Sequence, residues 1–171
     1  MLVAKSGETL VVRLLDGEKL PEALSHLPPS GVVVCGVGML REVVLGYWEA
    51  GKYLEERISA PVELLSLQGN IGEGPEGVVV HLHVVVGEKG GRALGGHLLF
   101  AVVHNTVEAV VLGLSGVRLL RKPEPTGLLG LYPESQGQAI FQTRDPPPSR
   151  GDVEIGPAGR AGMYPHELSA G

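Results

Sequence analysis

The sequence predicts an α/β protein of the α+β type, a mostly antiparallel β-sheet with one or two helices against it. Apolar runs of strand length recur along the chain and are separated by short glycine-containing turns. Only one stretch carries its apolar residues at helical spacing. The length of 171 residues and the hydrophobic content of 43% suit one domain with a real core.

Seven segments are expected to be β-strands because they are rich in valine and leucine and end at turn-forming residues. They are residues 2–14, 32–47, 61–71, 78–86, 94–103, 106–114 and 117–121. The second strand is expected to bend near Gly36 and Gly38, and residues 87–92 have the composition of a hairpin turn. His104 and Asn105 are expected to form a turn between two strands.

One amphipathic helix is expected over residues 18–27, where Leu20, Ala23, Leu24 and Leu27 recur at helical spacing. The pair Pro28-Pro29 should end this helix. Residues 53–58 are polar and are expected to be a connector rather than a strand.

The composition changes after Lys122. Eight of the 13 prolines lie between Pro123 and Pro165. We therefore expect a folded domain over residues 1–122 and a Pro/Gly-rich extension with little regular structure over 123–171. Residues 138–143 are the one stretch of the extension that could form a short strand.

Charge and cysteine content exclude several classes of protein. The net charge of −5 argues against a surface built to collect phosphates. The single cysteine, Cys35, forbids an internal disulfide, and its valine-rich surroundings favour a small buried side chain. No signal peptide and no apolar stretch of about 20 residues is visible, so a cytoplasmic protein without a membrane partner is expected.

Two histidines one residue apart, His81 and His83, interrupt the aliphatic run 78–86, and His97 follows on the next expected strand. Side chains alternate faces along a strand, so His81 and His83 should point the same way. The turn between the strands is short enough to make them neighbours, which would bring the three imidazoles together. Three imidazoles that converge can bind a divalent metal, and imidazole nitrogen suits Zn²⁺ best.

Two other interpretations of the histidines stay open. Buried imidazoles often bond to backbone carbonyls or to water without any metal. Three protein ligands also leave a fourth position open, as in a catalytic zinc site, which would require a base and a substrate pocket. Without these the domain would be a metal- or small-ligand-binding module with no catalysis. Glu63 and Glu108 are the candidate bases, and for each a structural role is the simpler explanation. Glu63 is expected to be partly buried.

The strand that holds the histidines is apolar on both of its faces. A sheet covered by one small helix cannot hide both faces, so burial against other subunits is expected. Tyr47 and Trp48, at the end of a strand, are expected at such an interface.

Four stretches of the chain, in order, resemble the PPC family, the "plants and prokaryotes conserved" domain. They are Pro-Val-Glu-Leu-Leu-Ser-Leu-Gln-Gly-Asn-Ile (61–71), Val-His-Leu-His-Val (80–84), Gly-Gly-His-Leu (95–98) and Thr-Val-Glu-Ala-Val-Val (106–111). The resemblance implies an antiparallel sheet, assembly as a homotrimer and a metal-binding unit at His81, His83 and His97. It also implies a regulatory or DNA-associated role, since plant members carry the domain beside AT-hooks.

Direct DNA binding by this chain is not expected, despite the resemblance. An AT-hook needs a basic Arg-Gly-Arg-Pro core, and the nearest string, Gly-Arg-Ala-Gly at 159–162, has one arginine and no proline. The expected domain has 11 basic and 13 acidic residues, and the extension has 3 and 6. Any contact with DNA would need several arginines to gather on one face. The candidates are Arg41, Arg57, Arg92, Arg118 and Arg121.

Overall fold

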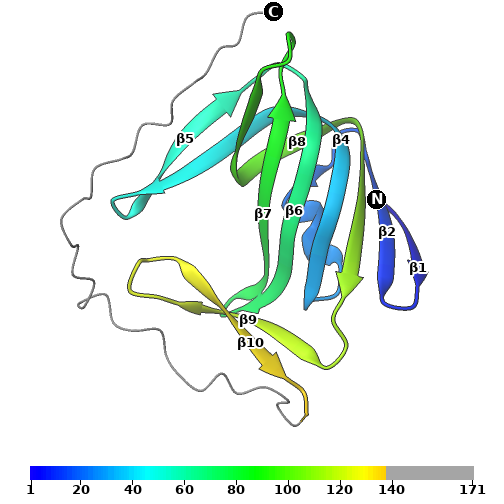
Figure 1. Cartoon of the computed structure of the whole chain (residues 1–171), viewed down its shortest axis with the longest axis vertical. Helices are drawn as coiled ribbons and strands as arrows, with labels where there is room; N and C mark the ends of the chain where they lie inside the picture. The colour runs from blue at the N-terminus through cyan, green and yellow to red at the C-terminus, as the bar shows by residue number, and fades with distance from the viewer. Residues whose placement is uncertain (138–171) are drawn as a thin grey trace, which may run out of the picture. The chain divides into compact units, whose positions relative to one another are not determined.

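The computed structural model describes residues 1–137, which belong to one compact unit. Within this range ten strands form a single sheet, with one short 3₁₀ helix beside it (Figure 1). The elements are β1 (Leu2–Ser6), β2 (Thr9–Leu15), β3 (Lys19–Leu20), η1 (Glu22–His26), β4 (Gly31–Glu49), β5 (Lys52–Ile58), β6 (Val62–Gly74), β7 (Gly77–Gly87), β8 (Ala93–Gly113), β9 (Val117–Pro123) and β10 (Leu129–Ser135).

The sheet is mostly antiparallel, as the sequence predicts. Its main order is β1-β2-β8-β4-β6-β9-β10, and β3 pairs with β8, β5 with β4, and β7 with both β6 and β8. The single parallel pairing joins β6 to β9 between Glu73 and Leu120. Because β4 pairs with β6 and β8, and β7 pairs with the same two strands, these four strands close on themselves around the core.

Two long, bent strands form the frame of the sheet. β4 has 19 residues and β8 has 21, and their pairing shifts register several times. The bend expected near Gly38 occurs where this residue has φ +150° and a Cβ atom would collide with the Thr106 carbonyl. The turn expected at His104 and Asn105 is wrong, because both lie inside β8. Asn105 has φ +67°, so the chain makes a local irregularity there and continues as a strand.

The helix expected over residues 18–27 does not form. The segment begins with β3, and only the five residues Glu22–His26 are helical, as a 3₁₀ turn. Pro21 follows β3 directly and has no N–H to donate, which prevents a helix from running through this point. Leu20 and Leu24 are nevertheless fully buried, so the apolar spacing identified core residues even though the expected helix was wrong.

The polar segment 53–58 is also a strand rather than a connector. β5 pairs with the end of β4 from Val43↔Ile58 to Glu49↔Lys52. Ala50 and Gly51 join them with φ of +48° and +81°, the positive pair that a tight hairpin turn requires.

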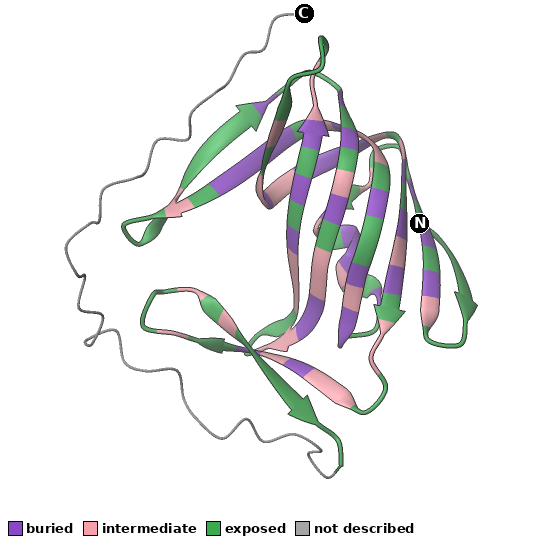
Figure 2. Cartoon of the chain, in the orientation of Figure 1, coloured by how far each residue is buried: buried purple, intermediate pink, exposed green. Residues whose placement is uncertain are grey.

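The core lies inside the closed part of the sheet and under the 3₁₀ helix (Figure 2). Leu67, Ile71 and Leu82 are among its fully buried side chains. The opposite face leaves large apolar side chains exposed. Cys35 also lies exposed, so the prediction of a buried thiol is wrong; apolar neighbours in sequence did not reveal which face of β4 is covered.

Regular structure continues past residue 122. β10 pairs with β9 from Leu129↔Pro123 to Ser135↔Val117 and forms a hairpin that projects from the sheet. The short strand expected over 138–143 lies outside the described residues. No helix within the described part of the chain is long and apolar enough to span a membrane.

Candidate functional site

The three histidines converge on one face of β7 and β8. The antiparallel register places His83 directly opposite His97, and His81 lies two residues along the same face of β7. One ring nitrogen from each histidine lies within 4.8 Å of the others, and the Nε2 atoms of His81 and His83 are 3.1 Å apart. The sequence prediction that these rings come together is confirmed.

Glycines in the neighbouring strands make room for this arrangement. Gly69 pairs with Leu82, and a Cβ at Gly69 would collide with the His81 carbonyl. Gly46 pairs with His97, and a Cβ there would lie 2.7 Å from Cδ1 of Tyr53. Tyr53 uses this space to stack on His97, with ring centroids 5.1 Å apart and planes 8° from parallel.

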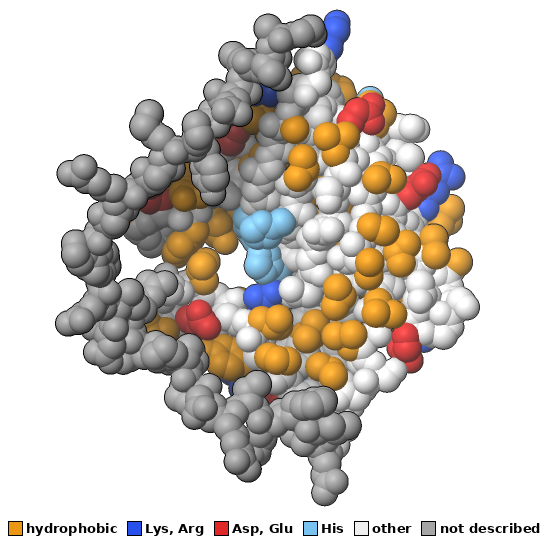
Figure 3. Space-filling model, viewed as in Figure 1, with side chains coloured by type: hydrophobic (Ala, Val, Ile, Leu, Met, Phe, Trp, Pro, Cys, Tyr) orange, Lys and Arg blue, Asp and Glu red, His pale blue; other side chains and the backbone are white. Residues whose placement is uncertain are grey.

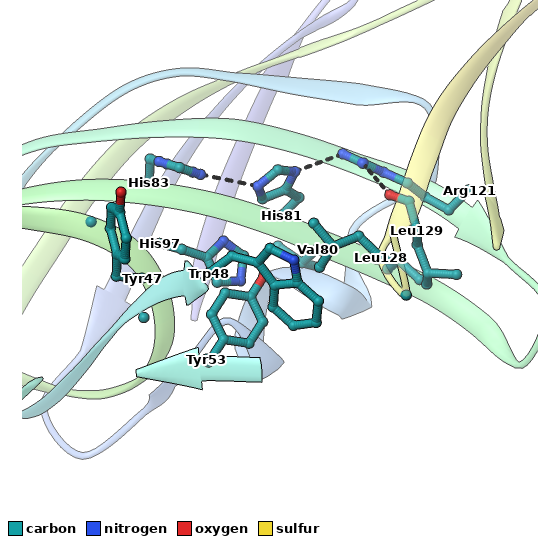
Figure 4. A pocket seen from close by; sticks show the side chains of 14 residues that line it. Tyr47, Trp48, Tyr53, Val80, His81, His83, His97, Arg121, Leu128 and Leu129 are labelled. Atoms are coloured by element: carbon teal, nitrogen blue, oxygen red, sulfur yellow. Dashed lines mark hydrogen bonds between the residues drawn. The ribbon is translucent and has the colours of Figure 1, made fainter. Parts of the chain in front are cut away.

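Arg121, from β9, lies behind the histidines and completes the site. Its Nη2 donates to Nδ1 of His81 at 2.9 Å and to Oδ1 of Asn70 at 2.5 Å, and its Nη1 donates to the Leu129 carbonyl at 3.0 Å (Figure 4). The residue is only 7% exposed. Sequence reasoning placed Arg121 among possible DNA contacts and missed this role, because the pairing of β9 with β6 has no local signal.

Burial and positive charge lower the pKa values of His81 and His97. The pKa of His81 falls to about 4, first because of burial and then because of the charges of Arg121, His97 and His83. The pKa of His97 is lowered by burial, by His83 and by Arg121. Metal ligation requires neutral imidazole, so the lowered pKa values of His81 and His97 favour the neutral rings that a metal needs.

The contact with Arg121 also fixes the proton on His81. A guanidinium can only donate, so Nδ1 of His81 accepts. The proton of the neutral ring is therefore on Nε2, where it can be donated to Nε2 of His83. Arg121 thus orients the ring of His81 toward His83.

The histidines and Arg121 line a cleft of about 790 Å³. Figure 3 shows the histidines at a hollow in this face of the molecule, with hydrophobic side chains around it. Tyr47 and Trp48 from β4 and Tyr53 from β5 line one side, and the turn between β9 and β10 contributes the other. The Trp48 and Tyr53 rings meet edge to face at 4.9 Å.

The candidate bases lie elsewhere. Glu63 and Glu108 are exposed and do not line the cleft, so the expected partial burial of Glu63 is wrong. A register shift between Leu64 and Ser66 breaks the alternation on which that expectation depended. Within residues 1–137, no aspartate or glutamate lines the cleft.

The geometry fits a tetrahedral metal ion. Zn–N bonds of about 2.1 Å imply ligand nitrogens about 3.4 Å apart. Nε2 of His81 and Nε2 of His83 are 3.1 Å apart, and the three ligand nitrogens all lie within 4.8 Å of one another. Nδ1 of His97 is buried without a hydrogen-bond partner, which is what metal ligation through this atom would require. Zinc held by these three nitrogens would keep a fourth position for a ligand.

Solved structures of similar proteins share this fold. A plant- and prokaryote-conserved protein from Pyrococcus horikoshii is 26% identical with a TM-score of 0.68, and the match covers 77% of this chain and 93% of that one. A candidate DNA-binding protein from Bacteroides thetaiotaomicron is 28% identical, with a TM-score of 0.70 and coverage of 77% and 96%. A metal-containing protein from Archaeoglobus fulgidus is 28% identical, with a TM-score of 0.67 and coverage of 77% and 99%.

Curated relatives are much longer than the matched region. The chain is 32% identical over 148 residues to the bifunctional protein GlmU of Synechococcus sp. strain JA-3-3Ab. The match covers 82% of this chain but 22% of that protein, so the chain spans about a fifth of its relative. The model of the Plants and Prokaryotes Conserved domain matches residues 1–115, which contain all three histidines. The chain therefore belongs to the Plants and Prokaryotes Conserved domain family.

Proposed function

We propose that this chain is a metal-binding domain in which His81, His83 and His97 hold one zinc ion per subunit. The observation that carries the proposal is the convergence of three imidazole nitrogens within 4.8 Å of one another at the floor of a cleft. Zinc suits three imidazole ligands, and the similar protein from Archaeoglobus fulgidus contains a metal.

The surroundings favour ligand binding over catalysis. When bound, zinc would act as a Lewis acid with one open coordination position. Tyr53 packs on His97, so this ring is held in place before any ion arrives. Nδ1 of His81 accepts from Arg121, so zinc at Nε2 of His81 would require the ring proton to move to Nδ1 and the contact with Arg121 to open. Hydrolytic chemistry also needs a base near the reacting atom, and Glu63 and Glu108 both lie away from the cleft.

The test is the zinc content of the purified full chain after dialysis, together with a competition titration for affinity. We expect about one zinc per chain for the wild type, and loss of stoichiometric uptake in a His81→Ala/His83→Ala double variant. The matched control is His26→Ala/His104→Ala, which removes two histidines outside the cleft. Equal zinc uptake by the two double variants would refute the proposal.

The domain is also proposed to assemble as a homotrimer. Val11, Val37, Leu65 and Val85 are large apolar side chains left 39–55% exposed on strands of the sheet, and a second copy could cover them. Sedimentation at micromolar concentration is expected to give three times 17.9 kDa. A monomer would refute this assembly.

We also propose that the domain has a regulatory role that operates through partner proteins rather than through direct binding to DNA. Similar structures include candidate DNA-binding proteins, yet this chain has a net charge of −5. Arg41, Arg57, Arg92 and Arg118 are each engaged with a carboxylate, and Arg121 is buried. An anisotropy titration with random duplex DNA at about 50 mM salt should show weak or no binding. Submicromolar affinity with a steep salt dependence would contradict it.

A further inference from the structure

Arg121 is a buried cation without an anionic partner in the described part of the chain. Its hydrogen bonds all go to neutral groups, Asn70, His81 and the Leu129 carbonyl. Its Nε is buried and has no hydrogen-bond partner. A guanidinium that is 7% exposed is costly to keep charged unless a counter-ion is present.

The groups around Arg121 add no negative charge. His81 contacts it directly, His83 and His97 line the same cleft, and no carboxylate within residues 1–137 lines that cleft. A zinc ion on the histidines would increase the positive charge further. The floor of the cleft is therefore complementary to an anion.

The side chains on the walls of the cleft indicate that the part of the ligand beyond its anionic group is apolar. Trp48 and Tyr53 offer aromatic surfaces, and Val80, Leu128 and Leu129 offer aliphatic ones (Figure 4). The cleft volume of about 790 Å³ is typical of sites that enclose a small molecule. Apolar walls would be poorly matched to a fully hydrated phosphate, and they suit an anion with an apolar body.

We propose that the cleft binds a small organic carboxylate, with its carboxylate at Arg121 and the histidine cluster and its apolar body against Trp48 and Tyr53. The guanidinium has five N–H donors and makes three hydrogen bonds, which leaves the buried Nε–H and one N–H of Nη1 without a partner. The inference rests on the proposed function only for the contribution of zinc, because the unpaired charge of Arg121 is present without it.

The only tryptophan of the chain, Trp48, lines the cleft and reports on the site directly. Benzoate, its neutral isostere benzamide and inorganic phosphate are titrated into the full chain at pH 7.5, metal-free and zinc-loaded, with tryptophan fluorescence as the readout. We expect benzoate to bind at least about tenfold more tightly than benzamide and more tightly than phosphate, as a charge-assisted contact would provide. Equal affinity for benzoate and benzamide, tighter binding of phosphate, or no response to benzoate would overturn the proposal.

Arg121→Gln is expected to lower benzoate affinity by at least about tenfold, because it removes the charge-assisted contact. Arg118→Gln makes the same change on the same strand, at a side chain that pairs with Glu73 outside the cleft, and should leave benzoate affinity unchanged. Equal effects of the two changes would overturn the proposal. If Arg121→Gln does not fold, the comparison of benzoate with benzamide in the wild type decides.

Zinc content is measured on the same samples, so the two proposals fail separately. A selective benzoate response without stoichiometric zinc would refute the zinc site and support the carboxylate site. Stoichiometric zinc without benzoate selectivity would do the reverse.

Discussion

The molecule contains two arginine–histidine pairs with similar contact distances, which differ in their burial and in their charged neighbours. Arg121 donates to His81 at 2.9 Å, and Arg41 contacts His104 at 3.0 Å. Arg41 also pairs with Asp16 at 2.8 Å, and the backbone N–H of Asn105 donates to the same carboxylate oxygen. The Arg41 side chain is 29% exposed, whereas Arg121 is 7% exposed and has no carboxylate partner within residues 1–137.

The difference separates a structural ion pair from a binding site. Contact with Arg41 lowers the pKa of Asp16, and the same contact raises the pKa of Arg41. Burial lowers the pKa of Arg121, and within residues 1–137 no carboxylate lies against its guanidinium to offset that effect. The pair of Arg41 and His104, with Asp16, stabilises the irregular part of β8 at Asn105. The pair of Arg121 and His81 leaves positive charge available to a ligand.

The largest expected effect is a loss of stability when either of two glycines, one near each arginine–histidine pair, is replaced by alanine. Gly69→Ala would force a methyl group into the His81 carbonyl, and Gly38→Ala would force one into the Thr106 carbonyl. Each should cost about 1–3 kcal/mol or more in the free energy of unfolding, because backbone must shift. Urea titrations measure the loss. Zinc affinity should fall only in Gly69→Ala, and an equal fall in Gly38→Ala would show that the two regions are coupled.

The pH dependence of stability should also distinguish the two regions. His81 has a folded pKa of about 4 against 6.5 when unfolded, so the unfolded chain binds the proton first as the pH falls. Stability of the metal-free protein is expected to be fully present above pH 6.5 and to decline toward pH 4. Thermal melts between pH 7.5 and 5 measure this loss above the range where carboxylates titrate.

His81→Gln should make that pH profile less steep, because it removes the histidine with a folded pKa of about 4 and leaves His97, whose pKa is also lowered. His104→Gln, in the exposed pair, is the control. An unchanged slope in His81→Gln would contradict the assignment.

Removal of the aromatic support for His97 should have a moderate effect. Tyr53→Leu removes a stacked contact worth about 0.5–1.5 kcal/mol, which corresponds to about twofold to tenfold weaker zinc binding. Competition titration with a zinc indicator measures it, and Tyr132→Leu, on β10 and outside the cleft, is the control. No change in Tyr53→Leu would show that stacking does not hold the His97 ring.

The smallest effect is expected at the exposed pair. Asp16→Asn removes the carboxylate partner of Arg41, but solvent can hydrate the guanidinium there, so stability should change little. Zinc and benzoate affinities should match the wild type in the titrations above. A clear fall in either would mean that the surface pair contributes to the cleft.

Much of the histidine cluster could be predicted from the sequence. Side chains alternate along a strand, which placed His81 and His83 on one face, and the short turn at 87–92 brought His97 opposite. The mostly antiparallel sheet was also predictable, because short turns join several consecutive strands as hairpins. The helix over 18–27 was wrong because Pro21 outweighed the apolar spacing.

The rest of the site was decided by tertiary structure alone. Arg121 reaches His81 across 40 residues of chain, through a strand that joins β6 at a single bridge. The aromatic wall depends on the β4–β5 hairpin, and the positions of Glu63 and Cys35 depend on strand irregularities and on which sheet face is covered. Local periodicity determines which way a side chain points along its own strand, whereas long-range packing determines what it meets there.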